Sequence, residues 1–174
     1  MQGFDHATHS CIVQFAKMLR NLDAWLGRGV DHAKAKSFDP DVLLTLRLAP
    51  DMFALVRQVQ SACDTAKLAA ARMADKEAPA HPDSEATVAQ LRERIAAVAA
   101  YLDGFTVADF AHAAERKISL PWMKGQWTPG SAYFLEFAIP NFYFHVNMAY
   151  AILRGAGVEL GKTVYIGSLP LHGM

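Results

Sequence analysis

Residues 131–154 constrain the fold of this chain more than any other segment, because they form a long, apolar and aromatic run with very few charges. Apolar residues recur along it at three- and four-residue steps, which places them on two neighbouring stripes of one helix. Such a helix is buried on several sides, so the other helices must pack around it. Pro140 lacks an amide hydrogen and conflicts with the carbonyl of residue 136, which predicts a kink or a division of the helix there. Ser131 is the expected N-cap, and Gly155 and Gly157 predict the end of the helix.

This segment has the length of a membrane span, for which about 20 residues suffice. Four polar residues argue against that placement, because buried polar groups are costly in lipid. No other segment of the chain resembles this one, and we therefore expect no membrane association. The four residues are Glu136, Asn141, His145 and Asn147.

Amphipathic spacing predicts three further long helices, at about residues 8–27, 50–74 and 84–103. Gly27 and Gly29 are the expected stop of the first one. A long connection, 105–130, precedes the last helix and alternates polar and apolar residues in a way that predicts a small β-hairpin held by Trp122 and Trp127. We expect short links elsewhere, and mostly loop after residue 158, with a short extended piece at 163–166. The predicted fold is an all-α four-helix bundle, formed as a single domain over residues 1–174.

Charge and cysteine content narrow the function classes. Seventeen basic residues balance seventeen acidic ones, and they form no basic stripe of the kind that nucleic-acid binding requires. The N-terminus lacks a basic segment followed by an apolar one, so we expect no secretion signal and a cytoplasmic location. Cys11 and Cys63 lie within apolar helical patterns, which favours unpaired core cysteines in a reducing compartment.

Three phrases of the sequence resemble a family of uncharacterised bacterial and fungal proteins in the DinB/YfiT-like superfamily. They are LAPDMFALVRQVQSACDTAKLAAARMA, ISLPW and FAIPNFYFHVNMAYAILRGAGVELGK, and the resemblance extends from the first helix to Lys162. It implies an up-down-down-up four-helix bundle and a homodimer. In that superfamily three histidines bind a divalent metal, often nickel or zinc. One lies on the second helix and two form HxxxH on the last helix, just before a segment that resembles YLRxxG.

Carried over to this chain, the resemblance identifies one retained histidine. Residues 151–157 match the segment after HxxxH, which places His145 at the second histidine position and Asn141 at the first. The position on the second helix falls within a residue or two of Gln60. Amide oxygens are weak ligands for zinc or nickel, so the resemblance implies a degenerate metal site with His145 as its metal ligand. Asp51 or Asp64 are the candidate carboxylate replacements.

Several interpretations of this site remain open at the level of sequence. His145, Asn141 and Gln60 form either a buried polar cluster or the ligand-binding end of a small-molecule pocket, with His145 as its polar anchor. The expected lining of that pocket is aromatic: Trp122, Phe142, Tyr143 and Phe144. Two less favoured hypotheses are a Cys63–His145 nucleophile pair and a metal site at the terminal pair His6 and His9.

The preferred interpretation is a dimeric binding or interaction module with no required cofactor. The alternative is a metal-dependent, thiol-linked transferase or hydrolase of the DinB-like superfamily, in which nickel or zinc acts as a Lewis acid.

Overall fold

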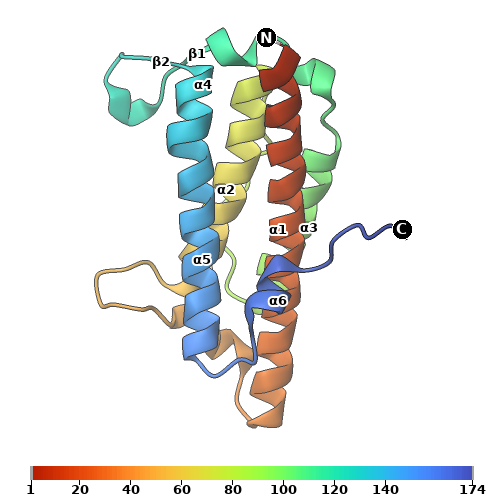
Figure 1. Ribbon diagram of the computed structural model, residues 1–174. Helices are drawn as coiled ribbons and strands as arrows, with labels where there is room; N and C mark the ends of the chain where they lie inside the picture. Colours follow the sequence, from red (N-terminus) through yellow and green to blue (C-terminus); the bar gives the residue numbers. More distant parts are fainter. Residues whose placement is uncertain (1, 174) are drawn as a thin grey trace.

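Four long helices form one bundle in the computed structural model, which describes residues 2–173 (Figure 1). Apolar side chains from all four helices meet in a common core. The predicted all-α four-helix bundle is therefore confirmed. The helices are α1 (Gln2–Ala35), α2 (Leu55–Ala74), α3 (Val88–Asp103) and α5 (Ile139–Gly155).

Helices α1 and α5 run in the same direction. The rings of Phe15 and Phe142 have centroids 4.1 Å apart. Further along both helices, the rings of Trp25 and Tyr150 meet at 5.3 Å. Because the residue numbers of the contacting pairs rise together, the first and last helices are parallel neighbours.

Helices α2 and α3 are also parallel to each other. Asp64 of α2 accepts a hydrogen bond from Arg94 of α3, and Glu77, just beyond α2, accepts one from Tyr101. The connection 75–87 must therefore return along the whole bundle, so the expectation of a short link was wrong at this point. The arrangement matches the up-down-down-up order that the resemblance implied.

Helix α1 extends well beyond its predicted end, because neither of its glycines stops it. A Cβ atom on Gly27 would lie 3.8 Å from the guanidinium of Arg92. A Cβ atom on Gly29 would lie 3.2 Å from a methyl group of Leu43. Both glycines sit inside the helix where neighbouring side chains approach its backbone, and the predicted stop at these positions was wrong.

The starts of α2 and α3 also differ from the predictions. The expected start of α2 at Pro50 is a turn, which follows the 3-10 helix η1 (Pro40–Thr45). Helix α3 begins at Val88 rather than at residue 84, since Thr87 forms a capping box with Gln90. The amide of Val88 also donates to Asp41 Oδ1 at 2.7 Å, which ties η1 to the start of α3.

The last helix divides at Pro140 as predicted, and the division takes the form of a widened turn. The last helix starts with α4 (Gly130–Ala132), whose N-cap is Pro129 and not the expected Ser131. It continues as the π-helix η5 (Tyr133–Ala138). The amide of Ile139 donates to the carbonyl of Phe134, five residues back. Pro140 follows in the first turn of α5, where its missing amide hydrogen costs no helical bond.

The connection between α3 and α4 contains the predicted small hairpin. Strand β1 (Lys117–Ile118) pairs antiparallel with β2 (Thr128–Pro129). The 3-10 helices η2 (Val107–Phe110) and η3 (Ala113–Glu115) precede the hairpin, and η4 (Pro121–Met123) lies within it. Trp122 is 61% exposed and Trp127 is 54% exposed, so these side chains do not form a closed hairpin core.

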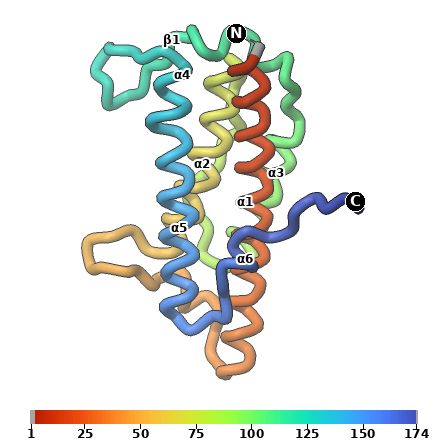
Figure 2. The backbone as a smooth tube through the Cα atoms, in the orientation of Figure 1, coloured from red at the N-terminus to blue at the C-terminus, as the bar shows by residue number. Residues whose placement is uncertain are grey.

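The C-terminal segment forms the short helix α6 (Lys162–Ile166) instead of the predicted extended piece. Trp25 Nε1 donates to the carbonyl of Val164, and the ring of Tyr165 stacks on Trp25 with centroids 5.3 Å apart. These contacts hold α6 across the side of α1 (Figure 2). Among residues 2–173, no helix has the combination of length and apolarity that a membrane span requires.

Candidate functional site

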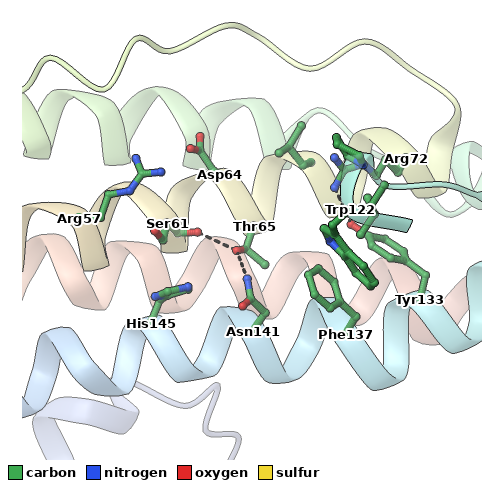
Figure 3. A pocket seen from close by; sticks show the side chains of 13 residues that line it. Arg57, Ser61, Asp64, Thr65, Arg72, Trp122, Tyr133, Phe137, Asn141 and His145 are labelled. Carbon is green, nitrogen blue, oxygen red and sulfur yellow. Dashed lines mark hydrogen bonds between the residues drawn. The ribbon is translucent and has the colours of Figure 1, made fainter. Parts of the chain in front are cut away.

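A pocket of about 270 Å³ opens between α2 and α5, with η4 at one end (Figure 3). Polar residues of α2 face polar residues of α5, and aromatic residues line one end. The residues that line it are Arg57, Ser61, Asp64, Thr65, Leu68, Arg72, Leu120, Pro121, Trp122, Tyr133, Phe137, Asn141 and His145.

His145 is buried and has a defined hydrogen-bond partner on α2. Its Nδ1 lies 2.8 Å from Gln58 Oε1. The amide nitrogen of Gln58 donates to the carbonyl of Phe53 at 3.2 Å, which fixes the orientation of the amide. Because Gln58 Oε1 only accepts, the hydrogen of the neutral imidazole is on Nδ1, and Nε2 carries the lone pair.

The electrostatic surroundings of His145 favour its neutral form. Burial lowers the pKa of His145 below its ordinary value of 6.5, and the positive charge of Arg57 lowers it further. Among residues 2–173, His145 Nε2 has no hydrogen-bond partner. The ring itself lines the pocket, so it offers the pocket one basic nitrogen without a partner.

Asn141 lies one helical turn before His145 on the same face of α5. Its Nδ2 donates to Thr65 Oγ1 at 2.7 Å, and the hydroxyl of Thr65 donates to the carbonyl of Ser61 at 2.7 Å (Figure 3). This chain fixes the amide so that the oxygen of Asn141 remains an acceptor for another group.

The charged residues of the pocket differ in how they are paired. Arg57 pairs with Asp83, and its guanidinium lies over the ring of Phe53. Asp64 contacts two cations, Arg94 Nη2 at 2.7 Å and the Lys67 ammonium at 2.8 Å. Both charges are thus balanced by groups of the protein itself.

Arg72 is the charged group of the pocket without such a balance. Its Nη1 donates to the hydroxyl of Tyr133 at 3.1 Å, and its guanidinium lies 5.8 Å from the centre of that ring. Within residues 2–173, no carboxylate lies within 4.0 Å of the Arg72 guanidinium.

Three aromatic rings form the wall at the Arg72 end of the pocket, as Figure 3 shows. The rings of Trp122 and Phe137 have centroids 5.8 Å apart, and those of Phe137 and Tyr133 are 5.9 Å apart. Tyr133 is buried, whereas Trp122 is largely exposed. The aromatic end therefore opens to solvent beside the Trp122 ring.

The structure brings His145 and Asn141 together but not Gln60. Gln60 Nε2 donates to Glu85 Oε2 at 2.8 Å, and Gln60 does not line the pocket. Asp51 is exposed in the link before α2. Of the terminal pair, His9 Nε2 contacts the carbonyl oxygen of Phe105 at 3.1 Å, and His6 is exposed.

The environment of Cys63 does not support a nucleophile. The side chain is fully buried, and burial raises the pKa of the thiol to about 12. Its charged neighbours include Arg94 and Glu85, on the side of α2 that faces α3. Cys11 and Cys63 are both free, in agreement with the predicted unpaired cysteines.

The donor atoms of the pocket do not fit a nickel or zinc ion. These metals prefer imidazole, thiolate and carboxylate ligands, and the pocket offers one imidazole nitrogen, neutral amide and hydroxyl oxygens, and Asp64, which already binds two cations. No group of three or more histidine, cysteine or acidic residues suited to a metal occurs within residues 2–173.

The aromatic lining differs from the sequence expectation. Of the four predicted rings only Trp122 lines the pocket, since Phe142 packs against Phe15 in the core and Phe144 is exposed. The observed wall comes from Tyr133 and Phe137 instead. Tyr133, Phe137, Asn141 and His145 recur at every fourth residue, a signal that would have identified this face.

Comparisons with known proteins agree with the fold. Residues 8–166 match a family described as Domain of unknown function (DUF1993). A crystal structure described as a DinB family member protein from Shewanella denitrificans is similar, with a TM-score of 0.96 and 48% sequence identity. The similarity covers 100% of this chain and 99% of the other. No curated protein matches the chain.

Proposed function

Because this chain belongs to the family Domain of unknown function (DUF1993) and shares the fold of a DinB family member, we propose that it is a binding module whose α2–α5 pocket holds a small organic molecule. His145 is the polar anchor of that ligand and Asn141 is a second contact. The ligand takes the place that a metal ion has in the wider superfamily.

The observation that carries this proposal is the fixed tautomer of His145. A purely structural polar cluster would use both ring nitrogens within the protein, because unpaired buried polar groups are costly. Here Gln58 occupies Nδ1 only, and Nε2 remains available as an acceptor for an O–H or N–H group. A neutral imidazole in an open pocket is suited to this role.

The competing metal-dependent transferase or hydrolase is less favoured. Lewis-acid chemistry needs an ion held by several strong ligands. The one strong ligand besides His145 in the pocket lining is Asp64, and its carboxylate already pairs with Lys67 and Arg94. The proposed module therefore uses His145 as a hydrogen-bond acceptor rather than as a metal ligand.

The test is a binding screen of small aromatic and heteroaromatic compounds by saturation-transfer NMR on wild type and on His145→Leu. We expect some compounds to bind wild type and not His145→Leu. The same compounds should still bind His9→Leu, because His9 lies outside the pocket. Absence of binders, or binders that ignore His145→Leu, would contradict the proposal. Elemental mass spectrometry on the untagged protein tests the alternative, which requires near-stoichiometric nickel or zinc that His145→Leu loses.

A further inference from the structure

We infer that the ligand is an aromatic carboxylate, whose anionic group binds Arg72 and Tyr133 and whose ring lies against Trp122 and Phe137. This inference rests on the proposed function and specifies the ligand class of the same pocket. It concerns the aromatic end, at a distance from His145 along α5 (Figure 3).

The guanidinium of Arg72 places a positive charge at this end of the pocket. A guanidinium that is half-buried and lacks a carboxylate neighbour loses part of its hydration without gaining an ion pair. The other charged groups of the pocket already have partners, as Arg57 does with Asp83. An incoming anion would therefore meet one uncompensated positive charge, and arginine binds planar carboxylates through two parallel hydrogen bonds.

The hydroxyl of Tyr133 supplies a second donor beside Arg72. Its oxygen accepts the hydrogen bond from Arg72, so its own O–H hydrogen is free to donate. None of residues 2–173 accepts from this hydroxyl. Arg72 and Tyr133 thus present neighbouring donors, the remaining guanidinium N–H groups and the phenolic O–H, which is the arrangement that a carboxylate requires.

An exposed aromatic surface lies beside these donors. Trp122 exposes 61% of its surface, although its ring is 5.8 Å from that of Phe137. A flat ring placed here would cover apolar area of both side chains, and offset or edge-to-face contacts between aromatic rings are favourable beyond that burial. A carboxylate attached directly to that ring would point to the Arg72 end.

The experiment compares two probes of the same shape, 2-naphthoate and the neutral 2-naphthamide, by calorimetric titration of the full chain. We expect the anion to bind at least about tenfold more tightly, the factor that corresponds to one charge-assisted hydrogen bond. Arg72→Gln should remove this difference by weakening naphthoate about tenfold and naphthamide less than about twofold. Arg28→Gln changes net charge equally on the surface of α1 and should leave both affinities unchanged.

A second variant separates binding from folding effects. Tyr133→Phe keeps the ring but removes the O–H donor, and we expect it to weaken naphthoate about fivefold while thermal unfolding shows a folded protein. Equal affinity for the two probes in wild type would overturn the anion inference and leave the pocket proposal standing. Failure of both probes to bind would overturn the inference, whereas the pocket proposal is decided separately by the binding screen with His145→Leu.

Discussion

Gln58 Oε1 accepts a hydrogen bond from Nδ1 of His145 across the 2.8 Å that separates them, and this contact joins α2 to α5 inside the bundle. The amide cannot turn over, because Gln58 Nε2 is committed to the carbonyl of Phe53. The protein thus selects one tautomer of His145 through a residue that does not itself line the pocket.

Gln58→Leu should destabilise the fold by about 1–3 kcal/mol, because it leaves the buried Nδ1 hydrogen of His145 without an acceptor. It should also release the tautomer, so that ¹⁵N NMR of the ring reports a mixture of Nδ1–H and Nε2–H forms. Urea unfolding gives the stability. Gln60→Leu is the matched control, since Gln60 bonds to Glu85 and its loss should leave the His145 tautomer unchanged. An unaltered tautomer in Gln58→Leu would contradict the assignment.

Stability should decrease as the pH falls from about 7 to about 5. Burial lowers the pKa of both His145 and His81. The positive charges of Lys67 and Arg94 lower the pKa of His81 further. The folded state favours both neutral forms. The contribution of the two histidines to the free energy of unfolding is complete above pH 6.5, their ordinary pKa. It is lost as the pH falls through their lowered folded-state pKa values.

Urea titrations at several pH values in this window measure the effect, since carboxylates titrate lower, with ordinary pKa values of about 4. The double variant His81→Gln and His145→Gln should show a flatter stability profile than wild type. A profile as steep as that of wild type would assign the pH dependence to other groups.

Gly130→Ala should cost more than about 2 kcal/mol of stability, because the new Cβ has no room. At its ideal position this atom would lie 2.0 Å from the carbonyl oxygen of Ala113, a backbone atom that cannot move aside alone. Gly155→Ala is the control at the end of α5, where no atom lies within 4 Å, and it should stabilise by roughly 0.5 kcal/mol. Thermal unfolding of both variants checks the prediction, and a stable Gly130→Ala would refute it.

Arg94→Met should destabilise the protein by about 3 kcal/mol, because it removes the buried cation that pairs with half-buried Asp64 and Glu85 and with exposed Asp83. The Arg94 side chain is 2% exposed. Its guanidinium holds Asp64 at 2.7 Å, Asp83 at 2.9 Å and Glu85 at 3.0 Å. Arg94 thereby attaches the connection 75–87 to the bundle.

Arg20→Met provides the comparison for Arg94→Met. Arg20 pairs with Asp103 on the surface, where both side chains are exposed, and such pairs contribute less than about 1 kcal/mol. Chemical denaturation of the two variants should therefore give clearly unequal losses. Equal losses would show that burial of the Arg94 network has no energetic consequence.

Local patterns determined much of the fold. The apolar stripes predicted four helices and their mutual packing, and Pro140 predicted the division of the last one. Backbone geometry at proline is intrinsic to the residue, so this prediction needed no neighbours. The prediction at Gly27 and Gly29 was wrong for the opposite reason. A glycine can either end a helix or allow a neighbouring side chain to approach its backbone, and the second role depends on the tertiary neighbours Arg92 and Leu43.

The sequence by itself determined that α2 carries Gln58 and Gln60 and that α5 carries Asn141 and His145. Tertiary structure alone decided that Gln58 faces His145 while Gln60 faces Glu85. Positions i and i+2 are about 200° apart around a helix of 3.6 residues per turn, so Gln58 and Gln60 lie on nearly opposite faces of α2, and the rotation of α2 about its axis decides which of them faces α5. That rotation is set by the packing of the whole core, and no local pattern in the chain contains it.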